Sequence, residues 1–322
     1  MNDPLLMAPL AAFHGAKPPA PEWFEHVIAQ EPERTFTEIE GAAIEVLAWG
    51  RRGKPGLIFH HGGGAHADWW SFIAPFFARD YRVVASSFTG MGRSEPRLVY
   101  QFEQFVREAY GAARAGGAFD GGRPVVVGHS FGGRVSMGLA HDFGDQYAAA
   151  ILIDPPFWAP QNRRTPNPPR ATKSRQPHAT LEALIGRFRL APPQTCENLY
   201  ILDFLARRSG KQVVDAHGRA GWMLCFDPVF WDRFKQADPE PLLRGARCPL
   251  ALIRGADSKL FGAVDAAHLL SLTPPDTPYI VIPDARHHVP IDQPLAVVAT
   301  LSALLQGWPP ARTISRGASS AE

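Results

Sequence analysis

The hydrophobic pattern of the chain predicts a sheet with helices on both faces. From residue 35 onward, short apolar runs alternate with longer helix-compatible segments, which is typical of a mainly parallel sheet. Apolar runs predict strands at 57–61, 81–87, 124–128, 149–154, 249–255 and 279–285, after a hairpin at 35–50. Runs such as VVV and AILI are apolar throughout, as expected of strands covered on both faces. We therefore expect an α/β fold with a doubly wound, mostly parallel sheet of eight strands.

The alternation of apolar strands and helix-compatible segments is interrupted between residues 155 and 247. The segment has no comparable apolar strand and starts with a proline-rich, basic stretch, QNRRTPNPPRATKSRQP. Such sequence cannot continue a parallel sheet, whereas the many aromatic residues that follow can fold onto one. We expect a helical cap at 155–247, inserted into a core made of 35–154 and 248–308. An N-terminal arm at 1–34, with a helix near 22–30, and a disordered tail at 309–322 complete the predicted organisation.

Composition excludes several classes of function. The 33 basic and 31 acidic residues leave a formal charge of +2, which gives no reason to expect nucleic acid. The longest apolar stretches are only about ten residues, against about 20 needed to cross a membrane. The first residues lack the basic region of a secretory signal, so we expect a cytoplasmic protein. Three cysteines without C-x-x-C spacing exclude the familiar zinc patterns and a disulfide framework.

The strongest chemical motif is G-x-S-x-G at residues 128–132. It directly follows the strand PVVV and precedes a helix-compatible run, the context that a nucleophile elbow requires. Gly128 and Gly132 are small enough for such a sharp turn, which would present the Ser130 hydroxyl away from the sheet. The turn also puts the amide of Phe131 at a helix start, where it can stabilise negative charge. The alternative is a glycine-rich turn without chemistry.

A second glycine motif, HGGG, ends the apolar strand LIFH at residues 61–64. Glycines let the backbone approach a ligand closely, so the amide of Gly63 is a candidate second oxyanion donor, with Gly62 and Gly64 shaping the turn. Residues 62–67 also fit the dinucleotide pattern G-x-G-x-x-A. That pattern expects an acidic residue at the end of the next strand, where this chain has Ser86 and Ser87.

Serine is a weak nucleophile and needs a base that is oriented by a carboxylate. Two histidines, His287 and His288, follow the last predicted strand. Adjacent residues in an extended loop point in opposite directions, so only one of them should face Ser130. The same geometry argues against a metal site at the histidine pairs 60–61 and 287–288.

From about residue 35 to 306 the chain resembles the α/β-hydrolase fold superfamily, through its strand order, HGGG, GHSFGG and the late histidine. Members resemble G-H-F-V-P-L-E-Q-P near that histidine, and RHHVPIDQP at 286–294 aligns on it without a gap. The resemblance therefore implies His287 as the catalytic base. YRVVASSFTGMGRS at 81–94 resembles the family's strand and D-x-x-G-x-G-x-S loop, except that Ser87 stands where an aspartate is usual.

Two positions are candidates for the acid. The common family pattern after the strand ALIRG is G-x-x-D, but here Ser258 is in register and Asp257 comes one residue early. The family's other acid position is the end of the preceding strand, which is Asp154, followed by a proline pair that fixes the backbone. We favour Asp154 and keep Asp257 as the alternative.

These features predict a serine hydrolase that cleaves a small or medium, largely apolar ester or lactone through an acyl-enzyme, with water and without metal or organic cofactor. Serine at the elbow argues against epoxide hydrolase and haloalkane dehalogenase chemistry, because the superfamily members that resemble those enzymes carry a carboxylate nucleophile there. The alternatives are a carbon-carbon bond hydrolase or a perhydrolase on the same triad, and a binding protein that only retains the fold. The basic run at 163–175 is expected to be a solvated loop rather than an attractor of anionic substrate.

Overall fold

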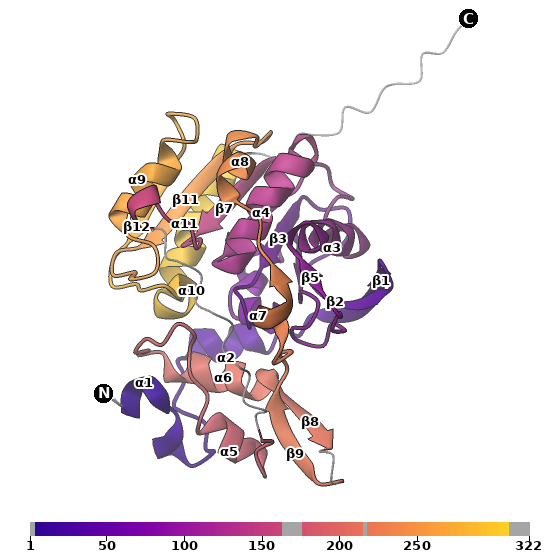
Figure 1. The fold of residues 1–322 in the computed structure, drawn as a ribbon, viewed down its shortest axis with the longest axis vertical. Helices are drawn as coiled ribbons and strands as arrows, with labels where there is room; N and C mark the ends of the chain where they lie inside the picture. The colour runs from indigo at the N-terminus through magenta and orange to yellow at the C-terminus, as the bar shows by residue number, and fades with distance from the viewer. Residues whose placement is uncertain (1–3, 163–175, 215–217, 309–322) are drawn as a thin grey trace, which may run out of the picture.

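Eight strands form one sheet in the computed structural model, which describes residues 4–162, 176–214 and 218–308 (Figure 1). The sheet order is β1-β2-β4-β3-β6-β7-β11-β12. The strands are β1 (Glu33–Ile39), β2 (Ala42–Trp49), β3 (Gly56–His60), β4 (Arg82–Ser86), β6 (Val125–His129), β7 (Ala149–Ile153), β11 (Leu250–Gly255) and β12 (Tyr279–Ile282). The predicted α/β fold with eight strands is confirmed. The predicted disordered tail and the basic run at 163–175 lie outside the described residues.

The sheet is parallel except at its first edge. β1 and β2 form the predicted antiparallel hairpin, and β2 also pairs antiparallel with β4. From β4 to β12 all neighbours run parallel, so their carboxyl ends meet at one edge. In parallel α/β sheets this edge is where ligands bind.

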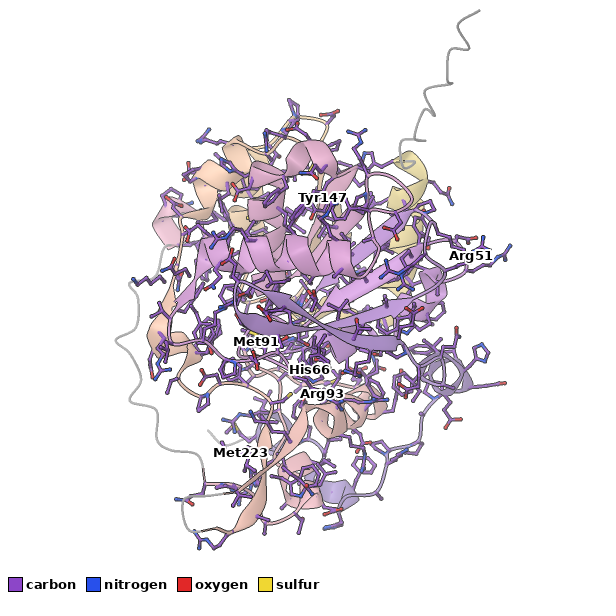
Figure 2. All side chains as sticks on the ribbon, turned by 90° about the vertical axis from the view of Figure 1, so that its right-hand side faces the viewer. Arg51, His66, Met91, Arg93, Tyr147 and Met223 are labelled. Atoms are coloured by element: carbon purple, nitrogen blue, oxygen red, sulfur yellow. The ribbon has the colours of Figure 1, made fainter. Side chains whose placement is uncertain are left out.

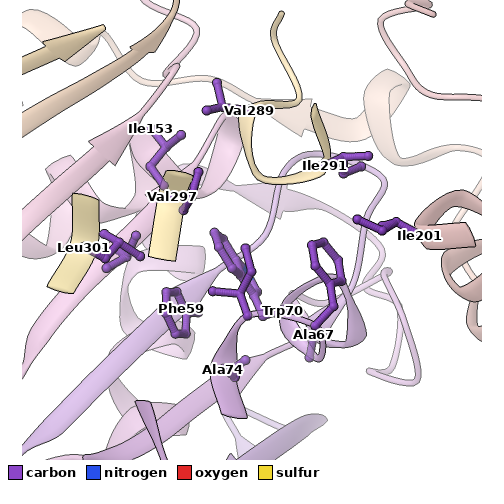
Figure 3. Close-up of a cluster of buried hydrophobic side chains, with 14 of the residues drawn as sticks. Phe59, Ala67, Trp70, Ala74, Ile153, Ile201, Val289, Ile291, Val297 and Leu301 are labelled. Atoms are coloured by element: carbon purple, nitrogen blue, oxygen red, sulfur yellow. The ribbon is translucent and has the colours of Figure 1, made fainter. Parts of the chain in front are cut away.

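Apolar side chains alternate between the two faces of the central strands, as strand geometry requires. Ile58, Val126 and Leu152 belong to a buried cluster on one face, which also contains side chains of α3 (Phe102–Ala115) and α4 (Phe131–Asp142). Phe59, Val127 and Ile151 belong to the cluster on the other face. Val297 and Leu301 of α11 (Pro294–Gly307) and Trp70 of the short helix η2 (Ala67–Trp70) pack there (Figure 3). The sheet is thus covered on both sides.

The segment between β7 and β11 contains short helices and also a hairpin. Its elements are α5 (Leu181–Ile185), α6 (Leu199–Ser209), β8 (Gly210–Val214), β9 (Ala220–Leu224), α7 (Phe230–Arg233), β10 (Phe234–Lys235) and α8 (Pro239–Arg244). The hairpin was not part of the expected helical cap. β8 and β9 make a separate two-stranded sheet with several exposed residues, so they lack the continuous apolar run by which buried strands are identified.

The N-terminal arm packs against this segment. Its helices are α1 (Pro4–Met7), η1 (Ala11–Phe13) and α2 (Glu22–Ile28), and α2 confirms the helix predicted near 22–30. The ring of Phe24 lies 4.8 Å from that of Tyr200 and 6.0 Å from that of Phe204, both on α6. In Figure 1 the indigo arm and the pink helices α5 and α6 lie together below the sheet. The division into arm, core and cap stays a prediction.

Two further α-helices are α9 (Ala263–Leu270), which covers the face of α3 and α4, and α10 (Val289–Asp292), which follows the late histidine pair. Within the described ranges, every helix is too short or too polar to span a bilayer.

Candidate active site

Ser130 occupies a strained turn between β6 and α4. Its backbone has φ 53° and ψ −120°, a conformation that costs energy for any residue with a side chain. A Cβ on Gly128 would lie 2.2 Å from the carbonyl oxygen of Gly132, and one on Gly132 would lie 2.4 Å from that of His60. Both glycines are therefore required sterically. The Ser130 amide donates to the carbonyl of Ile153 on β7 (2.9 Å), which fixes the turn to the sheet.

His287 lies between Ser130 and Asp154. Its Nε2 is 2.9 Å from Ser130 Oγ, and its Nδ1 is 2.7 Å from Asp154 Oδ2. The ionised carboxylate only accepts hydrogen bonds, so Nδ1 carries a proton and Nε2 is free to accept the serine proton. All three side chains are buried, with Asp154 fully enclosed. This arrangement can activate a serine nucleophile.

Asp154 follows directly on β7 with a positive φ of 45°. Besides His287, its Oδ2 accepts a hydrogen bond from Ser258 Oγ (2.7 Å) and its Oδ1 one from the Gly255 amide (3.2 Å). Asp257, the alternative acid, is exposed, and its amide is bonded to the carbonyl of Ala285. The structure thus brings Asp154 to His287 and leaves Asp257 outside. Ser258, which the sequence showed only as a departure from the family pattern, supports the carboxylate.

The glycine turn, residues 61–64, passes next to the nucleophile. A Cβ on Gly62 would lie 3.3 Å from Ser130 Cβ, and one on Gly63 would lie 3.6 Å from Phe131 Cβ. Gly64 has φ +76°, which favours glycine. The Gly63 amide makes no hydrogen bond to another residue in the described part of the chain. Phe131 begins α4, and the first amides of a helix have no partner within it. Both predicted oxyanion donors therefore lie beside Ser130.

Comparison with known proteins identifies the family of the chain. The profile of the alpha/beta hydrolase family matches residues 57–301, which include Ser130, Asp154 and His287. The chain belongs to the alpha/beta hydrolase family. Curated relatives that match most of the chain are named hydrolases, which supports an enzyme.

Two curated relatives cover most of the hydrolase. The 2-hydroxy-6-oxo-6-(2'-aminophenyl)hexa-2,4-dienoic acid hydrolase of Metapseudomonas resinovorans is 26% identical over 270 residues, 80% of this chain and 86% of its own. The 2-(acetamidomethylene)succinate hydrolase of Mesorhizobium japonicum is 24% identical over 240 residues, 73% of this chain and 82% of its own. Among solved structures, a thioesterase domain from the curacin biosynthetic pathway shares the fold. Its TM-score is 0.69 at 19% identity, covering 84% of this chain and 99% of its own.

His61 holds the glycine turn of the hydrolase in place. Its Nδ1 donates to the Gly62 carbonyl (2.7 Å), and its Nε2 accepts from the Phe88 amide (3.0 Å). Burial lowers the pKa of His61 to about 3, so the ring is neutral, as these two bonds require. Sequence reasoning did not assign this residue a role, although its place at the head of HGGG was the available signal.

Three further histidines lie buried near the site. His129 Nε2 donates to the carbonyl of His287 (2.8 Å), and burial, with His287 nearby, lowers the pKa of His129 to about 3. Burial likewise lowers the pKa of His60 to about 3 and that of His288 well below its usual value. Among the histidines named here, only His287 is hydrogen-bonded to Ser130 Oγ. Nor do the described residues include a group of three or more His, Cys, Asp or Glu side chains that could hold a metal ion.

These buried histidines predict a loss of stability in mild acid. The unfolded chain binds a proton at each histidine below pH 6.5, while His60, His61 and His129 stay neutral in the fold down to about pH 3. Their stabilisation is therefore complete above pH 6.5 and declines as the pH falls toward 3. Between pH 7.5 and 5.5 we expect the free energy of unfolding to drop by about 5 kcal/mol in all for the four histidines, His288 included. Urea denaturation at the two pH values measures this. Equal free energies would contradict it.

Proposed function

We propose that this hydrolase cleaves a small or medium, largely apolar carboxylic ester or lactone through an acyl-enzyme on Ser130. The observation that carries the proposal is the chain of hydrogen bonds from Asp154 through His287 to Ser130. In this assignment Ser130 is the nucleophile, His287 the base and Asp154 the acid. Gly63 and Phe131 supply the oxyanion donors.

The first half-reaction transfers the acyl group to the enzyme. Ser130 Oγ attacks the carbonyl carbon while its proton moves to His287 Nε2, and Asp154 stabilises the imidazolium that forms. Negative charge develops on the carbonyl oxygen, where the amides of Gly63 and Phe131 each contribute about 3 kcal/mol. The carbon-oxygen bond to the leaving group then breaks, and His287 returns the proton to the departing alkoxide.

The second half-reaction uses water. His287 takes a proton from the water as its oxygen attacks the acyl carbon, and the same two amides stabilise the second oxyanion. The bond between the acyl carbon and Ser130 Oγ breaks, and the proton passes from His287 to the serine. The carboxylic acid leaves, and the enzyme regains its starting state.

Apolar side chains above the glycine turn support an apolar substrate. Trp231 of α7 is 53% exposed, and its ring edge lies 2.9 Å from the place where a Cβ on Gly63 would stand. The ring of Phe226 lies 3.9 Å from the place where a Cβ on Gly64 would stand. It also lines a cavity of about 60 Å³ together with Met223, Leu224, Pro228, Gln176 and His178. The exposed indole of Trp231 beside Gly63 and the mainly apolar cavity lined by Phe226 suit the hydrocarbon part of an ester.

A second candidate is the cleavage of a carbon-carbon bond. It is favoured by the hexadienoic acid hydrolase of Metapseudomonas resinovorans, which matches along most of both chains. The same triad would serve in this reaction. After Ser130 attacks the carbonyl carbon, the bond from that carbon to a neighbouring carbon would break, and His287 would deliver a proton to the carbanion that leaves. A perhydrolase would instead accept hydrogen peroxide in place of water at the acyl-enzyme.

A substrate panel separates these reactions. We expect release of p-nitrophenol from p-nitrophenyl acetate and butyrate, with the higher kcat/KM for butyrate because its longer chain buries more apolar surface. A γ-lactone is expected to open, and a β-diketone and a 2-hydroxy-6-oxo-dienoic acid are expected to remain intact. Cleavage of the β-diketone or of the dienoic acid, without turnover of any ester, would overturn the ester assignment in favour of carbon-carbon hydrolysis. Peracid formation exceeding hydrolysis would favour the perhydrolase.

A matched pair of substitutions tests whether Asp154 is the acid of the triad. Asp154→Asn is expected to lower kcat by about 10³ to 10⁴, because the amide favours the wrong tautomer of His287. Asp257→Asn makes the same chemical change on an exposed loop and should leave kcat within about threefold. Both are measured on p-nitrophenyl butyrate, with circular dichroism to establish folding. Near-normal turnover by Asp154→Asn together with a large loss in Asp257→Asn would reverse the assignment.

A further inference from the structure

Ser87 stands at the position where the family pattern has an aspartate. The neighbouring strand β2 supplies a carboxylate at this place. Glu45 lies on β2, which pairs antiparallel with β4 so that Val46 is opposite Ser86. The Glu45 side chain is 1% exposed, and its Oε2 accepts hydrogen bonds from Ser87 Oγ (2.7 Å) and the Arg93 amide (3.0 Å). A carboxylate thus sits beside residue 87 although residue 87 is a serine.

The loop after Ser87 closes tightly over this carboxylate. Ser94 Oγ donates to the Ser87 carbonyl (2.6 Å) and accepts from the Glu45 amide (2.9 Å). A Cβ on Gly92 would lie 2.4 Å from Ser87 Oγ and 2.8 Å from Glu45 Oε2, so only glycine fits. Figure 2 labels Met91 and Arg93, which belong to this loop. A side chain at residue 92 would therefore displace Ser87 or Glu45.

The charge of Glu45 is balanced inside the protein. Arg34 pairs with Glu45 through Oε1 and with Asp68 at 2.8 Å. Burial alone would raise the pKa of Asp68, but His66 and Arg34 beside it hold that pKa well below its usual range. Buried carboxylates persist only when they are paired and hydrogen-bonded. The cluster of Arg34, Glu45, Asp68 and Ser87, here called the Glu45 cluster, meets both conditions.

The Glu45 cluster reaches the glycine turn through Ser87. The single hydroxyl proton of Ser87 goes to Glu45, so the lone pairs of Oγ accept the amide proton of Ala67 (3.0 Å). The next residue, Phe88, donates its amide to His61 at the other end of the turn (3.0 Å). Residues 87 and 88 therefore hold both ends of segment 61–67, which contains Gly63.

We propose that Glu45 and Ser87 are positioning residues that together take the place of the family's single aspartate and set the Gly63 amide toward Ser130. Neither side chain is bonded to Ser130 or His287, so they act through the glycine turn. The proposal rests on the proposed function, because it concerns the oxyanion donor of that reaction.

The test relocates the carboxylate. Glu45→Ala is expected to lower kcat on p-nitrophenyl butyrate about tenfold to a hundredfold with KM within threefold, because a small displacement of an oxyanion donor weakens only the transition state. Adding Ser87→Asp to that variant puts a carboxylate at the family position and should restore at least half of the loss on a logarithmic scale. No recovery in the double variant would overturn the proposal.

Glu108→Ala is the matched control. Glu108 is also 1% exposed and is bonded to an arginine, Arg97 (2.7 Å), and a hydroxyl, Thr89 (2.9 Å), but it makes no hydrogen bond to segment 61–67. Its loss should lower Tm comparably and leave kcat within threefold. Equal effects of Glu45→Ala and Glu108→Ala on kcat would show a merely structural role.

Ser87→Ala is the second variant, for the case that Glu45→Ala does not fold, because it keeps the pair of Glu45 with Arg34. We expect it to lower kcat threefold to tenfold. An unchanged kcat would overturn the proposal.

Amide hydrogen exchange separates this proposal from the proposed function. In Glu45→Ala, or in Ser87→Ala, exchange at residues 62–67 should accelerate at least tenfold, while exchange in α3 stays as in wild type. This readout needs no substrate. A wild-type protein without esterase activity would refute the proposed function, whereas unchanged exchange at 62–67 would refute the positioning role.

Discussion

The hydrogen bonds of His287 to Ser130 and to Asp154 are the interaction on which the site depends. Its partners lie 157 and 133 residues away along the chain, so only the sheet brings them together. β6 and β7 are neighbours and place Ser130 and Asp154 at adjacent carboxyl ends, while the loop after β12 returns His287 to the same edge. Strain at Ser130 and Asp154, both at positive φ, is tolerated because the surrounding sheet is buried on both faces.

Close backbone approach is the second constraint. Gly128 and Gly132 let α4 start against β3, and Gly62 lets the glycine turn pass over Ser130. Neutral, buried histidines then serve as rigid hydrogen-bonding groups: His61 fixes the turn, and His129 fixes the backbone of His287. Low dielectric around these groups strengthens the interactions that stabilise an oxyanion, while it makes the fold sensitive to acid.

Local signals made much of this predictable from the sequence. Uninterrupted apolar runs identified the six later strands, and the elbow was evident because a strand, two glycines and a helix coincide at Ser130. The choice between Asp154 and Asp257 was harder, because both strands end at the same edge and sequence does not give the path of a loop. The sequence of the hairpin β8-β9 has no regular pattern of buried positions, so these strands could not be identified from it. The serine at position 87 indicated that the family's carboxylate is absent from this position. The sequence did not indicate its replacement, because Glu45 lies 42 residues earlier and comes next to Ser87 only through the pairing of β2 with β4.

Covalent labelling tests directly whether Ser130 is an activated nucleophile. The purified protein is treated with a fluorophosphonate, and the adduct is located by intact mass and peptide mapping, with Ser130→Ala as the control. We expect one adduct per chain, on Ser130, and none in the variant, because only a serine bonded to His287 reacts at neutral pH. A wild-type chain that stays unlabelled, or that carries the adduct on another residue, would contradict the account.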